Sequence, residues 1–423
     1  MIKKVKIIST IFTALLLSAS LNGAGRGFAV IIDSPTYGAC KSEIEAYTTM
    51  LKSEGYTLYL RDADWREPQQ VKRELEKLYR DSNLRGAIFI GQIPIPMVRD
   101  AQYLTSAFKM DQRVFPMRES SVPSDRYYDD FDLKFDYLGQ DSTERLFHYF
   151  SLNSYSPQRI SCDIYTGRLK PTKEGEEGYN QIRNYFKKLV SERKVRNRLN
   201  VITTFTGEGS FSNSLTAWKE EGVTLREQFP ESFRGDGSVK LLFYAMYPYM
   251  KDVVTDELRR QESDLFIFHE HGLPERQYMS EHPKSIGSDE YIQAAKRIIR
   301  ERLRTKKSES ARSEYIKELK ERYPLDSTWF SGWNDKKVIK EDSILYANTG
   351  IDLSDLPVIA PNSRFVIFDA CYNGDFREKS YIGAEYIFAP GKTVVTFGNS
   401  ANVLQDKSSS DLMGILSLGF SIG

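Results

Sequence analysis

An α/β fold of two units, each with a mainly parallel sheet flanked by helices, is the fold class that the sequence predicts. Two observations predict it. Short apolar runs alternate with amphipathic helical patterns along most of the chain, and this alternation stops and restarts around the highly polar stretch Ser191–Asn200. Strand–helix alternation is typical of parallel sheets, because parallel neighbours need a crossover connection. We therefore expect one unit at 26–195 and a second at 196–423.

The first unit is expected to alternate strands and helices up to residue 195. The expected strands are Phe28–Ile32, Tyr56–Leu60, Gly86–Gly91 and Asp163–Gly167, and the expected helices are Lys41–Ser53, Pro68–Arg80 and Glu174–Val190. Proline suits the first turn of a helix, where its missing N–H group is not needed. The stretch 100–161 interrupts the pattern, and we expect it to be a long irregular region.

The second unit repeats the alternation. Its expected strands are VITTF (201–205), KLLFYA (240–245), DLFIFHEHG (264–272), RFVIFDAC (364–371) and KTVVTFG (392–398), with helices near Asn213–Phe229, Met250–Gln261 and Asp411–Leu418. Residues 273–362 separate two of these strands and contain a charge-dense run typical of a solvated helical hairpin. We expect this insertion to lie outside the central sheet, at the edge where it begins and ends.

Charge and composition exclude some partners. The chain has 59 basic and 58 acidic residues, a net charge of +1, and 40% hydrophobic residues. A protein that binds nucleic acid through its general surface carries an excess of basic residues. We therefore expect no nucleic-acid partner.

The N-terminus has the layout of a secretory signal peptide, which we place at 1–24. Three lysines precede an apolar core at Ile7–Leu17, and small residues follow, with cleavage sites after Ser20 or Ala24. The apolar core is shorter than the ~20 residues that a membrane span requires. The sequence thus predicts an exported protein (periplasmic, cell-surface or secreted) with no integral membrane span after signal cleavage.

Two predicted strands of the second unit end in reactive residues. DLFIFHEHG ends in His271–Gly272, and RFVIFDAC ends in Cys371. Parallel strands bring their carboxyl ends to one edge of the sheet. A thiol beside an imidazole can be deprotonated to a nucleophilic thiolate, and the imidazolium then protonates the leaving amine. Gly272 permits close backbone approach, so we expect the N–H groups of Gly272 and Cys371 to act as oxyanion donors.

These residues carry a resemblance to a known family. A strand ending in His-Gly and a later strand ending in Ala-Cys resemble the caspase-like clan of cysteine peptidases, and FVIFDACYNGDF is similar to the nucleophile segment of the gingipains. FIGQIPIPM, PSDRYYDDFD and DIYTGRLKP are similar to further gingipain segments, so the resemblance covers most of the chain from Phe28 to Asn402. It implies a three-layer fold with two side-by-side subdomains of four and six strands. It also implies a peptidase that acts on protein or peptide substrates.

The resemblance also assigns roles to individual residues. It implies Cys371 as nucleophile, His271 as general acid/base and Asp163 as the carboxylate that orients the histidine. It implies cleavage after Arg or Lys, with the acidic residues Glu174, Glu176 and Glu177 in the matching stretch. A preference for Asn or Asp, as elsewhere in the clan, stays open.

Other interpretations stay open beside this one. His269 lies two residues before His271, and a strand would place both on one face, so a metal-dependent hydrolase using His269 and His271 is the alternative enzyme. A non-catalytic binding protein on the same fold is the third hypothesis. Cys40 and Cys162 are expected to be non-catalytic, whether or not they pair with each other.

No cofactor is required for the expected chemistry, but the acidic stretch 124–132 is a candidate structural calcium site. The residues that would supply its oxygen ligands are Asp125, Asp129, Asp130 and Asp132. Hard cations take several oxygen ligands, and the resemblance to gingipains, whose domains bind calcium, favours this interpretation.

Overall fold

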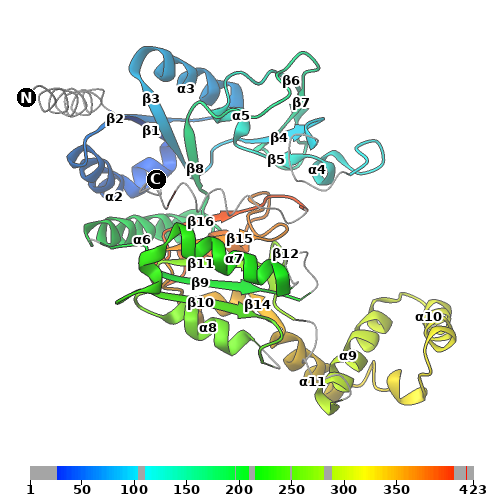
Figure 1. Cartoon of the computed structure of the whole chain (residues 1–423). Coiled ribbons are helices and arrows are strands. Elements are labelled where there is room, and N and C mark those ends of the chain that lie inside the picture. The colour runs from blue at the N-terminus through cyan, green and yellow to red at the C-terminus, as the bar shows by residue number, and fades with distance from the viewer. Residues whose placement is uncertain are drawn as a thin grey trace, which may run out of the picture. The chain divides into compact units, whose positions relative to one another are not determined.

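The computed structural model describes residues 26–102, 110–195, 197–208, 215–247, 250–280 and 288–403, together with Leu416. The predicted signal peptide and all but Leu416 of the predicted helix Asp411–Leu418 lie outside these residues. The chain divides into two compact α/β units between Lys194 and Val195 (Figure 1).

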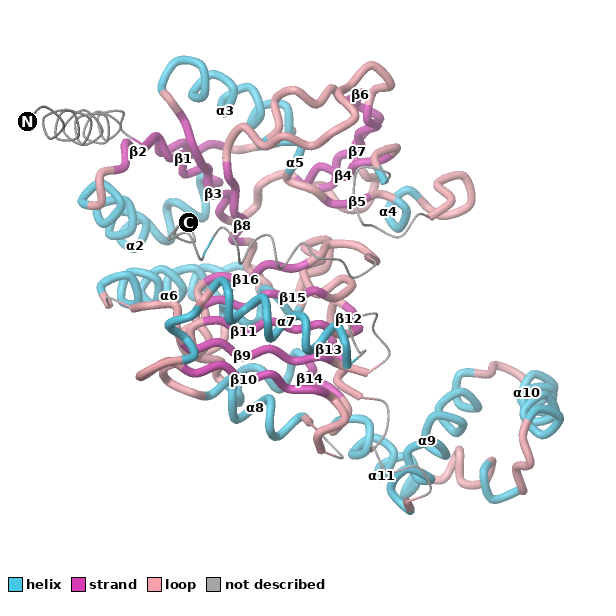
Figure 2. Tube along the Cα trace, in the orientation of Figure 1, coloured by secondary structure: helices cyan, strands magenta, loops and turns pink. Residues whose placement is uncertain are grey.

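The first unit is built on a four-stranded parallel sheet in the order β2-β1-β3-β8. Its strands are β1 (Arg26–Asp33), β2 (Tyr56–Ala63), β3 (Leu84–Ile90) and β8 (Tyr165–Leu169), and its long helices are α2 (Ser34–Ser53), α3 (Pro68–Ser82) and α6 (Gly175–Lys194). Alternate residues Ala29 and Ile31 of β1 pack with Val71 and Leu75 of α3, as the period of a strand requires. Helices α2 and α6 lie together on the other face (Figure 2).

The stretch 100–161 is not irregular, contrary to the expectation. It supplies three strands of a second sheet in the order β5-β4-β7-β6. The elements are β4 (Ile95–Arg99), β5 (Val122–Pro123), β6 (Phe135–Gln140) and β7 (Phe147–Leu152), with the short helices α4 (Met117–Ser120) and α5 (Arg126–Asp129). Strand β6 is largely exposed and contains a register shift between Tyr137 and Gly139, so its sequence lacks the regular alternation that identifies a strand.

The second unit has a five-stranded parallel sheet in the order β10-β9-β11-β15-β16 among the described residues. Its strands are β9 (Val201–Thr206), β10 (Ser238–Phe243), β11 (Leu265–His269), β15 (Phe365–Asp369) and β16 (Val395–Gly398). Its helices are α7 (Leu215–Gln228), α8 (Lys251–Arg259), α12 (Leu356–Ile359) and α13 (Ile382–Phe388), with the 3₁₀ turns Pro230–Phe233 and Leu353–Asp355. The sequence predicts all five strands but not α12 or α13.

Side-chain alternation divides the core of this unit into two layers. Phe266 and Phe268 of β11 pack in the cluster that includes residues of α8, α12 and α13. Leu265 and Ile267 pack in the opposite cluster, which includes Leu225 of α7. Helices thus cover both faces of the sheet, which gives a three-layer α/β unit.

The described part of 273–362 adds no strand to this central sheet, since β11 and β15 are direct neighbours. Its strands form a separate antiparallel sheet, β12 (His271–Leu273), β13 (Arg276–Tyr278) and β14 (Gly350–Asp352). Between β13 and β14 lie α9 (Asp289–Thr305), α10 (Glu309–Arg322), the 3₁₀ turn Ser327–Trp329 and α11 (Lys336–Ala347). The helical part of the insertion therefore begins and ends at this small sheet, next to His271. Its last residues lead back to the amino end of β15, where the Asn362 N–H donates to the carbonyl of Leu258 at 2.7 Å.

Two ion-pair networks hold the insertion together. Arg300 and Arg304 of α9 both bond the carboxylate of Asp342 in α11. Arg276, which is 1% exposed, bonds Asp352 and donates to the carbonyl of Tyr346 at 2.6 Å. By contrast, α10 has no buried residue. The root of the insertion is therefore fixed to the β12–β14 sheet, while α10 presents a solvated, charged surface.

Candidate active site

The backbone of His271–Gly272 lies directly against that of Cys371. A Cβ atom added to Gly272 would lie 2.5 Å from the Cys371 carbonyl oxygen and 2.6 Å from Oδ1 of Asn373. Real Cβ atoms do not approach other heavy atoms so closely. Only glycine fits at this position, and the structure thus brings together the histidine–glycine pair and the cysteine that the sequence singled out.

The amide of Asn373 ties the two segments together. Its Nδ2 group donates to the carbonyls of Leu273 at 2.7 Å and Arg276 at 3.2 Å. Asn373 is fully buried, so solvent does not compete for these bonds. Asn373 therefore holds the β12–β13 hairpin against the turn that carries Cys371.

The chain turns sharply after the cysteine. Tyr372 has φ of 58°, a left-handed conformation that costs a residue other than glycine about 1–2 kcal/mol. Its N–H group donates to the carbonyl of Ala401 at 3.2 Å, and the N–H of Asp375 returns to the Tyr372 carbonyl at 2.9 Å. Strain of this kind persists where the surrounding structure fixes it, often at functional sites.

The thiol of Cys371 is partly buried and surrounded by its own hydrogen bonds. Its Sγ atom donates to Oδ1 of Asn402 at 2.9 Å and accepts from the N–H of Val403 at 3.4 Å. Burial raises the pKa of the thiol, the Val403 N–H lowers it in part, and the carboxylate of Asp369 raises it again. The pKa stays above its ordinary value, so the resting cysteine is a neutral thiol rather than a preformed thiolate.

His269 and His271 do not share a strand face, contrary to the expectation. Strand β11 ends at His269, the chain bends at Glu270, and His271 begins β12 of the other sheet. His271 is exposed and His269 is buried. The two imidazoles therefore occupy different environments.

His269 lies between two carboxylates. Its Nδ1 is 2.9 Å from Oδ2 of Asp369 and its Nε2 is 2.7 Å from Oε1 of Glu221. The parallel register pairs His269 with Asp369, and both side chains point to the face that α7 covers, where Glu221 lies one turn before the buried Leu225. The sequence did not single out Asp369 or Glu221, although Asp369 was detectable as the residue on the same strand face as Cys371.

This network fixes the charge of His269. Burial by itself would lower the pKa of the imidazole, but the Glu221 charge and the Asp369 and Glu221 hydrogen bonds outweigh it and raise the pKa to about 10. A protonated imidazole with both nitrogens bonded to carboxylates has no lone pair for a metal. These contacts count against the metal-dependent alternative, and within the described ranges no group of three acidic, histidine or cysteine side chains is placed to hold a metal ion.

Replacing His269 by Gln should therefore destabilise the protein by about 3–5 kcal/mol at pH 6, because two buried carboxylates lose their common partner. The raised pKa means that the stabilisation is fully present below the unfolded-state pKa of ~6.5 and is lost as the pH rises through about 10. Urea unfolding of the wild type and His269→Gln at several pH values measures this. If the difference in the free energy of unfolding between the two proteins does not shrink between pH 6.5 and pH 10, His269 is not held in its protonated form by these carboxylates.

Asp163 lies just before β8, not within the strand predicted for it. Its N–H donates to the carbonyl of Asp129 at 2.8 Å, and its Oδ2 accepts from the N–H of Phe131 at 2.7 Å. Its charge raises the pKa of the Tyr79 hydroxyl. A turn with these partners starts the strand two residues later than expected. The orientation of His271 by Asp163 stays a prediction.

Three of the four aspartates of the candidate calcium site, Asp125, Asp129 and Asp130, already have partners within the protein. Asp125 forms two hydrogen bonds with Arg168, at 2.8 and 3.0 Å. Asp129 is buried, bonds Arg126 at 2.9 Å, and has its pKa raised to about 6 by burial. An aspartate already paired with an arginine is a poor ligand for a cation.

Asp130 is occupied as well. It accepts backbone N–H groups from Leu133 at 3.2 Å and Ser161 at 2.6 Å, whereas Asp132 is exposed. Asp130 thus stabilises the loop around α5 by capping backbone N–H groups. Calcium binding by this stretch stays a prediction, and the proposed function does not depend on it.

The other two cysteines are not bonded to each other. Cys40 is buried with its Sγ 3.5 Å from the carbonyl of Tyr179, while Cys162 is exposed beside Arg126. We expect Cys40→Ser/Cys162→Ser to keep peptide hydrolysis within about twofold of the wild type, since serine has a similar volume and neither thiol belongs to the unit that carries Cys371. Complete loss of hydrolysis in the folded double variant would count against this expectation.

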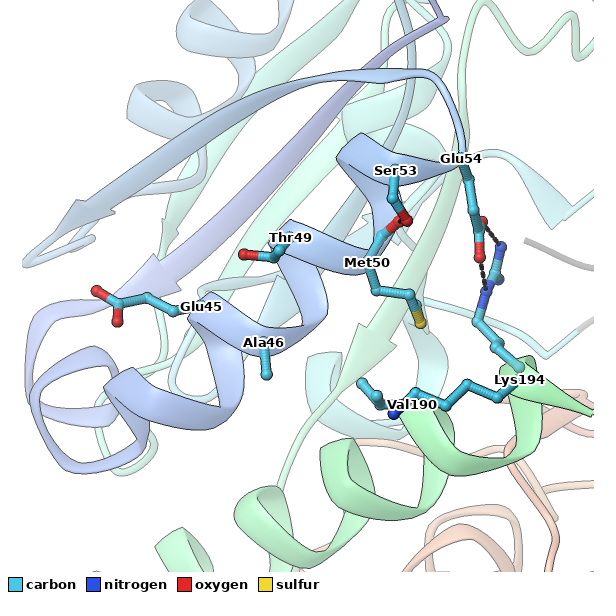
Figure 3. A pocket seen from close by; sticks show the side chains of 9 residues that line it. Glu45, Ala46, Thr49, Met50, Ser53, Glu54, Val190 and Lys194 are labelled. Carbon is cyan, nitrogen blue, oxygen red and sulfur yellow. Dashed lines mark hydrogen bonds and ion pairs between the residues drawn. The ribbon is translucent and has the colours of Figure 1, made fainter.

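A broad groove lies in the first unit, between α2 and α6 (Figure 3). Its volume is about 660 Å³, and its walls include Ala46, Met50 and Val190, with the Glu54–Arg193 ion pair at one end. No thiol or imidazole lines it. The groove itself therefore offers no nucleophile or general base of the kind that the sequence predicts.

Among the described helices, none combines the length with the apolar composition that a membrane span requires. Comparisons of the chain with protein-family models, with curated proteins and with solved structures found no match.

Proposed function

We propose that the protein is an exported cysteine endopeptidase with a caspase-like, gingipain-like catalytic domain. The observation that carries the proposal is the close approach of Gly272 to the Cys371 carbonyl. It supports a site in which a histidine, a glycine N–H and a thiol act on one substrate carbonyl. The parallel pairing of β11 with β15 supports the same arrangement, because both strands end at this edge.

The chemistry would begin with a neutral thiol. His271 accepts the Cys371 proton as the thiolate attacks the scissile carbonyl carbon, and the N–H groups of Gly272 and Cys371 stabilise the resulting oxyanion. The imidazolium then protonates the leaving amine, and a thioester remains. Water, deprotonated by His271, attacks the thioester, and the acid product leaves with the thiol restored.

The proposed substrates are protein or peptide chains cut after a basic residue. Near Cys371, the acidic groups of the second unit are already engaged. Asp369 bonds His269, and Asp375 forms a bidentate pair with Arg377 at 2.8 Å. The sequence offers Glu174, Glu176 and Glu177 as the carboxylates that recognise a basic residue. Of these, Glu176 already pairs with Arg183 at 2.8 Å.

A positional-scanning library of fluorogenic peptides tests both statements. Hydrolysis with enrichment of Arg or Lys before the cleaved bond supports the proposal in full. Hydrolysis with Asn or Asp preferred before the cleaved bond would support the proposed peptidase activity but overturn the proposed preference for basic residues. No hydrolysis of any library member by the folded, correctly processed protein would favour the non-catalytic binding alternative.

A further inference from the structure

A segment that follows β16 lies along the turn that carries the nucleophile. We call Asn399–Val403 the strap. The carbonyl of Asn399 accepts from the N–H of Gly374 at 3.0 Å, and the carbonyl of Ala401 accepts from the N–H of Tyr372 at 3.2 Å. The Asn399 side chain donates to the carbonyl of Ala370 at 3.1 Å. The strap is thereby fixed on both sides of Cys371.

The end of the strap makes direct contact with the sulfur. Oδ1 of Asn402 accepts the thiol proton at 2.9 Å, and the Val403 carbonyl lies 3.4 Å from Sγ. A hydrogen-bond acceptor stabilises the protonated form of an acid and opposes its ionisation. The Val403 N–H, at 3.4 Å, is the one strap group that favours the thiolate, and its contact is longer than that of Asn402.

We propose that Asn402 is a latch on the nucleophile: it holds the proton of Cys371 in the resting protein, and this contact must break before His271 can accept that proton. The effect of this contact on catalysis rests on the proposed peptidase function, whereas its effect on ionisation of the thiol does not. The latch makes ionisation of the thiol depend on displacement of the Asn402 amide, for example by a substrate backbone that takes its place. The resting protein would then resist reaction with other electrophiles.

Charged and titratable groups around the thiol come from three elements. Asp369 belongs to β15, His271 to β12, and the Asp375–Arg377 ion pair to the turn after the nucleophile. Tyr372 adds a hydroxyl whose pKa burial raises. The strap itself carries no charged residue, so substitutions at Asn402 change the hydrogen bond to sulfur and leave these groups in place.

The test measures alkylation of Cys371 by iodoacetamide between pH 6 and pH 10, in the Cys40→Ser/Cys162→Ser background, with the product quantified by mass spectrometry. A hydrogen bond of about 0.5–1.5 kcal/mol corresponds to a factor of roughly 2–12. Asn402→Ala should alkylate faster at pH 7 by about that factor, with its rate profile shifted to lower pH. Asn402→Asp should alkylate more slowly than the parent, because a carboxylate beside the sulfur opposes ionisation. Ser400→Ala, in the same strap, is the matched control and should match the parent.

Two results would overturn the latch. An unchanged rate in Asn402→Ala would mean that the contact has no energetic consequence. A slower rate would mean that the amide donates to the sulfur and favours the thiolate. If Asn402→Ala is misfolded by circular dichroism, Asn402→Leu, which likewise has no group to accept the thiol proton, is judged by the same two results. Peptide hydrolysis is measured separately. If the alkylation rates change as expected but neither the parent nor any variant hydrolyses peptides, the proposed role of Asn402 stands and the proposed peptidase function is refuted.

Discussion

Replacing Cys371 or His271 by alanine should lower peptide turnover by about 10³-fold or more, and combining the two should add little. Residues that act as one unit in covalent catalysis lose nearly the whole effect when either is removed. The measurement is kcat/KM on the best library peptide, with the unfolding midpoint of each variant as a check on folding.

The matched control for His271 is His269→Gln. Both nitrogens of His269 are bonded to carboxylates, so this variant should lose stability yet keep detectable cleavage. If His269→Gln is inactive while folded, and the wild type loses activity with a chelator and regains it with zinc, a metal-dependent hydrolase replaces the cysteine peptidase.

Gly272→Ala should reduce kcat by about 10²-fold even though it changes a single methyl group. The added Cβ would lie 2.5 Å from the Cys371 carbonyl oxygen, so the hairpin carrying His271 must move away from the cysteine by a large fraction of an ångström. Misplacement of a catalytic group by about 1 Å costs on the order of 10²-fold in rate. Steady-state kinetics on the variant and the wild type measure the effect.

Gly38→Ala is the matched control for this substitution. Gly38 lies in α2, and an added Cβ would meet nothing within 4 Å. It should leave kcat unchanged and slightly stabilise the helix, because alanine has the higher helix propensity. Equal kcat values for Gly272→Ala and the wild type would show that the close approach is not needed for turnover.

The strands that carry the candidate site were predictable because they are buried and short. The segments around β11 and β15 are continuous apolar runs, which is typical of parallel strands covered on both faces. Their adjacency was harder to foresee, since 95 residues separate His269 from Phe365 in the chain. It followed only from the expectation that His271 and Cys371 work together.

The partners of His269 could not be predicted in the same way. Glu221 appears in the sequence as one of several charged residues on an amphipathic helix, where a glutamate is usually solvated. Only the three-dimensional register of α7 against β11 places it 2.7 Å from the imidazole. The contact of Asn402 with Cys371 joins residues 31 positions apart through a loop. The periodic patterns that predict helices and strands do not predict a contact of this kind.

The break in the strand at Glu270 was missed for a related reason. The run DLFIFHEHG contains no residue that predicts a break, so the sequence favours one strand through its whole length. Side chains two residues apart in a strand share a face, which would place His269 and His271 together. In the structure the strand ends at His269 because the next side chain, that of Glu270, is buried against β13. Glu270 is 1% exposed and accepts from the Gln277 amide at 2.7 Å, a contact with β13 that accompanies the change from the central sheet to the β12–β13 hairpin.

Labelling with a peptidyl acyloxymethylketone, followed by mass-spectrometric mapping of the modified residue, tests the central claim most directly. Such a probe is attacked by a catalytic thiolate and forms a stable thioether. The proposed mechanism predicts modification at Cys371 alone in the wild type and a large loss of labelling in His271→Ala. Labelling at Cys162 instead, or equal labelling of Cys371 in the wild type and in folded His271→Ala, would contradict it.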